Sequence, residues 1–184
     1  RLRSWSLMLA CSSGFLVFFV ENGVNSTILP IYFNSTLGYD VSIIGLLMGV
    51  RSIGFILSNF LTGPLSDRLG RRFFLFVAAA LYASTFFLIT YLTGFEMLVL
   101  LMVMLGVANG MVQVTLPVLA AEAVDPSLRG IAIGTFRTSF DIGAIVGPVV
   151  TTLILNSMGV LPCFYIATLL MAVDFALALA VRKV

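Results

Sequence analysis

Long, nearly uninterrupted apolar stretches alternate along the chain with short polar segments. Each stretch is long enough for a bilayer core, which takes roughly 20 apolar residues of helix. Lipid leaves only helices and closed barrels to satisfy the backbone, and the period-two alternation of barrel strands is absent. The pattern therefore predicts an all-α membrane protein with six transmembrane helices, at residues 7–32, 41–62, 73–92, 97–123, 131–158 and 163–181.

Composition agrees with this prediction and excludes several classes of function. The chain has 184 residues, of which 60% are hydrophobic and only 10% charged, whereas a soluble domain carries about 25% charged residues. It has no histidine, and both cysteines, Cys11 and Cys163, lie in predicted helices. The motifs His-Glu-x-x-His and Gly-x-Ser-x-Gly are also absent. We therefore expect no enzyme activity, no cofactor, no metal, no disulfide framework and no nucleic-acid partner.

The distribution of basic residues predicts the orientation of the helices. Mapped onto six helices, the connections on one side hold Asp40 and Glu96 but no lysine or arginine. Cytoplasmic connections are the ones enriched in lysine and arginine, so both chain ends are predicted to lie in the cytoplasm. Eight of the ten basic residues fall on that side: Arg1, Arg3, Arg68, Arg71, Arg72, Arg129, Arg182 and Lys183.

Two halves of the chain resemble each other. Asn22-Gly23 is followed by Leu29-Pro30, and Asn109-Gly110 is followed by Leu116-Pro117 at the same spacing. An Arg…Gly-Pro pattern also occurs once in each half. With three helices per half, the two copies enter the membrane from opposite sides. We therefore predict one bundle built as a 3+3 inverted repeat, with residues 6–92 and 97–181 as its halves, an arrangement typical of secondary transporters. The alternative is chance recurrence of these dipeptides.

Ionisable residues inside predicted helices are the first candidate functional groups. Each costs roughly 2.5–3.5 kcal/mol at the bilayer centre, so they must face protein or water and pair with one another. Counting residues from the helix ends places Glu21 and Arg51 at similar depth and predicts an ion pair between them. Arg137 and Asp141 are four residues apart and can meet on one helix face. Asp174 lies near the depth of Arg137 and competes for it.

Uncharged polar residues predict where cargo would bind. Glu21 and Asn25 share a face of the first helix, and Asn109 and Gln113 share a face of the fourth, its equivalent in the repeat. Together with Asn22, these residues predict a polar cavity at mid-depth, where transporters hold their substrates. The alternative is that the amides join helices and the glycines allow close packing. We prefer that structural interpretation for Ser58, Asn59 and the glycines.

The segment between the second and third helices carries a family resemblance. It reads Gly63-Pro-Leu-Ser-Asp-Arg-Leu-Gly-Arg-Arg72, which we interpret as a tight cytoplasmic turn and which resembles motif A of the major facilitator superfamily. Gly143-xxx-Gly147-Pro148 resembles the antiporter motif, although Thr151 and Thr152 replace its customary trailing glycines. Glu21 before Leu29-Pro30 is similar to the acidic motif of drug:proton antiporters. The chain thus resembles the amino-terminal six-helix half of such a carrier.

The resemblance implies roles for individual residues. The conformational-switch loop would comprise Gly63, Asp67, Arg68, Gly70, Arg71 and Arg72, with Glu122 as the partner of Arg71. Helices one and four would line the cavity, two and five would contact the other half, and three and six would face lipid. Asp174 does not fit a lipid-facing helix. Met102 stands where many members carry an arginine on the fourth helix, so Arg51 or Arg137 is expected to replace it.

These observations predict a secondary active, multi-pass membrane transporter. It would move a small organic solute by alternating access, most consistent with proton-coupled efflux, and amphipathic cations suit the cavity slightly better than phosphates or sugars. We expect the chain to be half or a fragment of a twelve-helix carrier, whose second half is either in the same polypeptide or supplied by a homodimer partner. The alternative is a six-helix membrane scaffold or oligomeric subunit that transports nothing.

Overall fold

A computed structural model describes residues 2–180 of the protein. Arg1, Arg182 and Lys183, which contribute to the predicted orientation, lie outside the described residues, and the orientation stays a prediction. The first long helix is formed by α1 (Leu2–Val20), η1 (Glu21–Ile28), α2 (Leu29–Ile31) and η2 (Tyr32–Thr36). The others are α3 (Val41–Leu69), α4 (Arg71–Leu88), α5 (Phe95–Glu122), α6 (Arg129–Met158), preceded by the short η3 (Pro126–Leu128), and α7 (Val160–Ala180).

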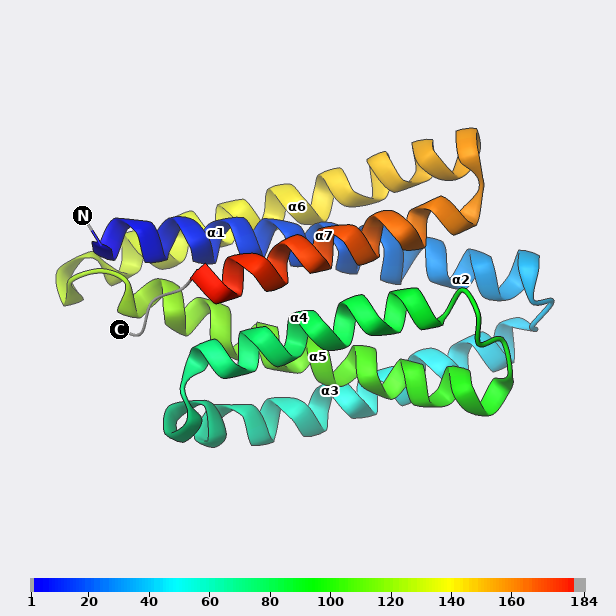
Figure 1. Ribbon diagram of the computed structural model, residues 1–184, viewed down its shortest axis with the longest axis horizontal. Coiled ribbons are helices and arrows are strands. Elements are labelled where there is room, and N and C mark those ends of the chain that lie inside the picture. Colours follow the sequence, from blue (N-terminus) through cyan, green and yellow to red (C-terminus); the bar gives the residue numbers. More distant parts are fainter. Residues whose placement is uncertain (1, 181–184) are drawn as a thin grey trace.

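The all-α membrane architecture predicted from the apolar pattern is confirmed. Six helices within the described residues are long and apolar enough to cross a membrane, and no strand occurs between residues 2 and 180. Figure 1 shows the helices running side by side along the long axis of the molecule. The start of α1 and the end of α7 lie at the same end of the bundle, which we call the terminal end.

The helices pair across the two halves of the chain. α1 packs along α6, α3 packs along α5, and α4 packs along α7 (Figure 1). In an inverted repeat, α1, α3 and α4 correspond to α5, α6 and α7. Exchanging the halves then converts the α1–α6 pair into the α5–α3 pair, so the first pair requires the second. The division into repeats at residues 6–92 and 97–181 stays a prediction that these pairings support.

Glycines allow the backbones of the paired helices to approach closely. Gly23 lies against the backbone of Gly147 on α6, and Gly106 lies against the carbonyl of Arg51 on α3. A Cβ at either glycine would overlap backbone atoms of the partner helix. Small residues at such positions are typical of helix packing in membranes, where van der Waals contact replaces the hydrophobic effect. The contacts of Gly23 and Gly106 are therefore consistent with the preferred packing role, whereas Gly45 and Gly49 face open space.

Two helices, α3 and α6, expose large apolar side chains. Phe60 on α3 and Ile145 on α6 are 76% and 70% exposed. Water would be an unfavourable environment for surfaces of this kind, whereas a bilayer or an apolar protein surface suits them. The interior of the bundle is formed to a large part by α1, η1 and α5, which together carry about half of the buried residues.

The segment predicted as a tight turn from Gly63 to Arg72 is mostly helical, so that prediction was wrong. α3 continues through Pro64 to Leu69, and α4 begins at Arg71. Gly70 alone separates them, with a φ of 93° that glycine adopts without the steric cost of a Cβ. The missing N–H of Pro64 removes one helical hydrogen bond but does not stop the helix, and the Ser66 hydroxyl donates to the Gly63 carbonyl (3.1 Å).

Candidate functional site

The first long helix widens where its polar residues lie. η1 and η2 are π-helical, with hydrogen bonds such as that from the Leu29 N–H to the Val24 carbonyl. Pro30, two residues after the end of η1, lacks an N–H. The Thr27 hydroxyl donates to the Asn22 carbonyl (2.8 Å). π-helical turns inside α-helices occur frequently at functional sites. Glu21, the first residue of η1, is the centre of a cluster of polar side chains.

Glu21 is the acceptor for four side chains from four different segments. Its carboxylate forms an ion pair with Arg51 of α3, so the predicted pair is present. Asn109 of α5 donates to Oε1 (3.0 Å). Asn25 of η1 and the hydroxyl of Tyr82 of α4 donate to Oε2 (2.9 and 3.0 Å). We call these five residues the Glu21 cluster.

The Glu21 cluster is shielded from solvent. Glu21, Asn25, Asn109 and Tyr82 are buried, and the side chain of Arg51 is only 16% exposed. A cation and three neutral donors offset part of the cost of burying this carboxylate, because their hydrogen bonds replace its lost water. The arrangement joins the first four spans at one ionisable group. A proton that bound Glu21 would cancel the charge on which all of these contacts depend.

Three buried atoms of the Glu21 cluster have no hydrogen-bond partner. They are the amide oxygens of Asn25 and Asn109, and Nε of Arg51. Each asparagine thus uses its donor on Glu21 and leaves its acceptor free. If Glu21 were protonated, an amide rotated by a half-turn could accept the new O–H, since the two ends of an amide differ only as donor and acceptor. The cluster therefore holds hydrogen-bonding capacity for both charge states of Glu21.

Tyr82 was missed from the sequence. It is a single hydroxyl within the apolar α4 sequence, and nothing in the spacing of that helix distinguishes it from a packing aromatic. Its ring is fully buried and stacks on Phe86, with ring centroids 6.0 Å apart. A count of depth from the helix ends could have placed it near Glu21, as it did Arg51.

Arg137 and Asp141 form a second and separate pair. Arg137 Nε lies 3.7 Å from Asp141 Oδ1 on α6, and the side chains are 64% and 55% exposed. The guanidinium also lies over the ring of Phe140, 4.3 Å from its centroid. The predicted i,i+4 contact is thus present, but no ion pair joins it to Glu21 or Arg51 among the described residues. The four charges do not form one cluster.

Asp174 does not compete for Arg137, so that expectation was wrong. It is 3% exposed, in the interior of the bundle rather than toward lipid, and its carboxylate interacts with the Ser13 side chain of α1. The reason is that α7 packs on α4 and α1, and the face with Asp174 is part of that contact. The expected lipid exposure of spans three and six therefore does not hold for Tyr82 and Asp174.

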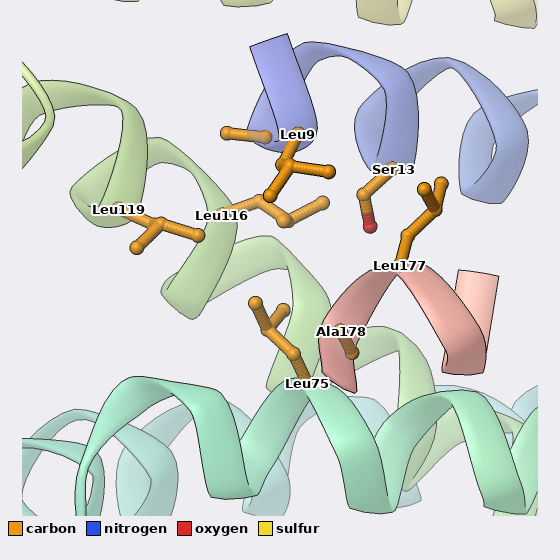
Figure 2. Close-up of a pocket in the computed structure, with 8 residues that line it drawn as sticks. Leu9, Ser13, Leu75, Leu116, Leu119, Leu177 and Ala178 are labelled. Atoms are coloured by element: carbon orange, nitrogen blue, oxygen red, sulfur yellow. The ribbon is translucent and has the colours of Figure 1, made fainter. Parts of the chain in front are cut away.

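The predicted substrate residues divide into buried and half-buried groups. Glu21, Asn25 and Asn109 are buried within the Glu21 cluster. Asn22 is half-buried and donates to the Phe18 carbonyl (3.1 Å), and Gln113 is also half-buried. A pocket lies elsewhere, between Leu9, Ser13, Leu116 and Leu177 near the terminal end (Figure 2). Whether the five polar residues contact cargo stays a prediction.

The switch segment contains a network of charges at the junction of α3 and α4. Arg71 donates through Nε and a terminal nitrogen to both oxygens of Glu122 on α5 (2.6 and 2.7 Å), the pair expected from the resemblance. A terminal nitrogen of Arg71 also lies 3.1 Å from Asp67. Arg72 donates to the last carbonyls of α7, at Ala178 and Leu179. Arg68 is exposed.

The antiporter-like segment of α6 is a packing surface for the first helix. Gly143 lies against the backbone of Phe15, and Gly147 lies against that of Phe19. Thr151, one turn beyond Gly147, donates to the Gly23 carbonyl (3.1 Å). Pro148 is inside the continuous helix α6. This surface fixes the position of η1, and with it Glu21.

The chain matches the family model described as Major Facilitator Superfamily over residues 10–184. The chain belongs to the Major Facilitator Superfamily. As a member of this superfamily with six apolar helices, it is an integral, multi-pass membrane protein. The family suggested by the Gly63–Arg72 segment is thereby confirmed.

Relatives within the superfamily include proteins named for different cargoes. The chain is 31% identical over 155 residues to "Multidrug resistance protein MdtG" of Proteus mirabilis, covering 82% of this chain and 38% of the relative. It is 31% identical over 107 residues to the "Hexuronate transporter" of Bacillus subtilis, covering 58% and 25%. The chain therefore spans less than half of the length of these relatives.

A solved structure shows the same superfamily fold. The crystal structure of a D-xylose-proton symporter superposes with a TM-score of 0.79 at 20% identity, covering 100% of this chain and 49% of that one. At this identity the match speaks for the fold alone. It agrees with the prediction that these six helices resemble half of a major facilitator carrier.

Proposed function

We propose that the chain forms one half of a secondary active transporter that moves a small organic solute by alternating access, driven by protons in the direction of efflux. The observation that carries this proposal is the Glu21 cluster. It places one ionisable carboxylate, with its own cation, at the contact of the first four spans. A bundle held together only by packing would have no need of so costly a buried charge.

The coupling proposed here is between the charge of Glu21 and the contact of η1 with α3. With Glu21 ionised, Arg51 holds α3 against η1. With Glu21 protonated, the attraction to Arg51 is reduced to a neutral hydrogen bond, and the two segments are free to separate when the bundles rock. Because a proton bound on one side would be released on the other, cargo movement and proton movement become linked.

The direction and cargo class are supported by resemblance rather than geometry. The relative from Proteus mirabilis is named for multidrug resistance, and the acidic residue in the first span is similar to the motif of drug:proton antiporters. Since other relatives carry names of sugar-acid and organic-cation transporters, the experiment below begins with an organic cation, for which the polar cavity predicts a slight preference.

The test is transport by the full-length protein in proteoliposomes. Ethidium is the cargo probe, and a pH-sensitive dye enclosed in the vesicles reports protons. We expect an imposed proton gradient to drive ethidium against its concentration gradient, with opposite proton flux. Glu21→Gln should abolish this gradient-driven step but keep downhill exchange of ethidium.

Glu96→Gln is the matched control, because Glu96 is exposed at the start of α5, outside the Glu21 cluster. It should transport as the unmodified protein does. Unchanged proton-driven transport by Glu21→Gln would remove Glu21 from the mechanism. Failure of the unmodified protein to move ethidium, a hexuronate or a pentose would favour the non-transporting scaffold.

A further inference from the structure

Asp174 is a buried carboxylate without a cation. It is 3% exposed, and its Oδ1 has no hydrogen-bond partner. No ion pair involves it among the described residues. This is the reverse of Glu21, whose carboxylate has a guanidinium and three donors. An isolated carboxylate that is desolvated in this way costs several kcal/mol if ionised, and such groups become neutral instead.

The other ionisable groups around α7 are already engaged. Arg72 of α4 donates to the final carbonyls of α7. Arg137 of α6 pairs with Asp141 on the exposed side of that helix. Tyr82 of α4 donates to Glu21 of η1. Arg71 of α4 pairs with Glu122 and Asp67. Cys11 of α1 is a free thiol.

A small pocket lies beside Ser13, toward the terminal end of the bundle. Ser13 interacts with Asp174 and also lines the pocket together with Leu9, Leu177 and Ala178. Figure 2 shows the Ser13 hydroxyl directed into this space, between α1 and α7. The pocket has room for about one water molecule at most. A hydroxyl is both a donor and an acceptor, so Ser13 can pass hydrogen bonds from such a water to the carboxyl group.

On its other side, Asp174 approaches the Glu21 cluster. It lies close enough to Tyr82 for an electrostatic interaction, and Tyr82 donates to Glu21. Ser13 precedes Glu21 by eight residues on one helix, which is about 12 Å at 1.5 Å per residue. Asp174 and Tyr82 therefore lie between the terminal-end pocket and the coupling carboxylate.

We propose that Asp174 is a second proton-binding site, occupied in the conformation described, which exchanges its proton with the terminal end of the bundle through Ser13. Binding forms one O–H bond on the carboxylate with a proton from water, and release returns that proton to water. The site deepens the proposed function, on which it rests for its role in coupling. Its occupancy can be measured without any transport.

The test is infrared spectroscopy of the full-length protein in lipid nanodiscs at neutral pH. A protonated carboxyl group has a carbonyl stretch that is distinct from carboxylate bands. We expect Asp174→Asn to remove such a band and Glu21→Gln to leave it, because the Glu21 carboxylate forms an ion pair with Arg51. Asp40→Asn is the matched control, since Asp40 is exposed in a connection, and it should leave the band unchanged.

Asparagine resembles the neutral acid in size and polarity, so Asp174→Asn is expected to fold, as checked by elution volume and circular dichroism. The band persisting at full intensity in folded Asp174→Asn would overturn the proposal, as would its absence from the unmodified protein. Transfer to D₂O gives a second measurement. Ser13→Ala should slow the deuterium shift of the band several-fold, and an unchanged rate would refute the route through Ser13.

These outcomes separate the two proposals. Loss of the acid band in Asp174→Asn, together with unchanged proton-driven transport in Glu21→Gln, would retain the Asp174 site and refute Glu21 as the coupling group. Loss of proton-driven transport in Glu21→Gln, together with no acid band that depends on Asp174, would retain Glu21 as the coupling group and refute the Asp174 site.

Discussion

The ion pair at the centre of the bundle is predicted to be energetically asymmetric. Glu21 has three neutral donors besides Arg51, whereas Nε of Arg51 is buried without a partner. Removing Glu21 thus leaves a cation with nothing to replace its lost partner. Removing Arg51 leaves an anion that still has three hydrogen bonds and can bind a proton.

The variants are chosen to limit any added cavity, since Glu21→Gln keeps side-chain size and Arg51→Met keeps an unbranched apolar stem. Glu21→Gln leaves Arg51 uncompensated, and breaking a buried pair in this way costs about 3–5 kcal/mol of unfolding free energy. Arg51→Met should cost less, about 1–3 kcal/mol, comparable to leaving one buried polar group unsatisfied. The double variant has no unpaired charge, and we expect it to be more stable than Glu21→Gln alone by at least about 1 kcal/mol.

The assay is reversible unfolding in bicelles by steric trapping, which gives free energies without removing the lipid environment. Strict additivity of the two single variants would contradict the pairing. Arg51→Met proving as costly as Glu21→Gln would refute the reasoning about the three neutral donors, even if the pair itself exists.

Two further predictions concern helix packing and the switch segment. Gly106→Val should lower the free energy of unfolding in bicelles by about 1–3 kcal/mol or more, because its Cβ would overlap the Arg51 carbonyl. Gly49 faces open space, so Gly49→Ala should change this free energy little. Arg71→Lys should lower the transport rate of the full-length protein, since lysine cannot make the two parallel hydrogen bonds to Glu122. Its melting temperature should change little, because the partly exposed pair contributes little stability. An unchanged transport rate would show that the paired geometry is dispensable.

The sequence was sufficient for the fold and for part of the site. Helix length and apolarity are set by bilayer thickness, so the six spans could be located, although α3 continues to Leu69, beyond its predicted end at residue 62. Depth counting found the Glu21–Arg51 pair, because a rise of 1.5 Å per residue converts position into height. Spacing found Arg137 and Asp141 for a similar reason: both are on one helix.

Rotational position was the information that the sequence lacked. α7 is apolar on all sides, so nothing in its pattern indicates whether Asp174 faces lipid or the interior. The same holds for Tyr82, whose importance depends on which neighbour it meets. The turn predicted from Gly63 to Arg72 was wrong for another reason, since the hydrogen bond lost at Pro64 does not end a helix whose remaining turns are intact. These outcomes depend on contacts between helices, which pattern and composition do not specify.

The single residue between α3 and α4 has a mechanical consequence. α3 and α4 are joined by Gly70 alone, without a flexible loop between them. A tilt of α3 must therefore displace the first turn of α4. That turn carries Arg71 and Arg72, which are tied to α5 and to the last turn of α7. Motion of α3 is therefore transmitted through α4 to the ends of α5 and α7, and these helix ends move together.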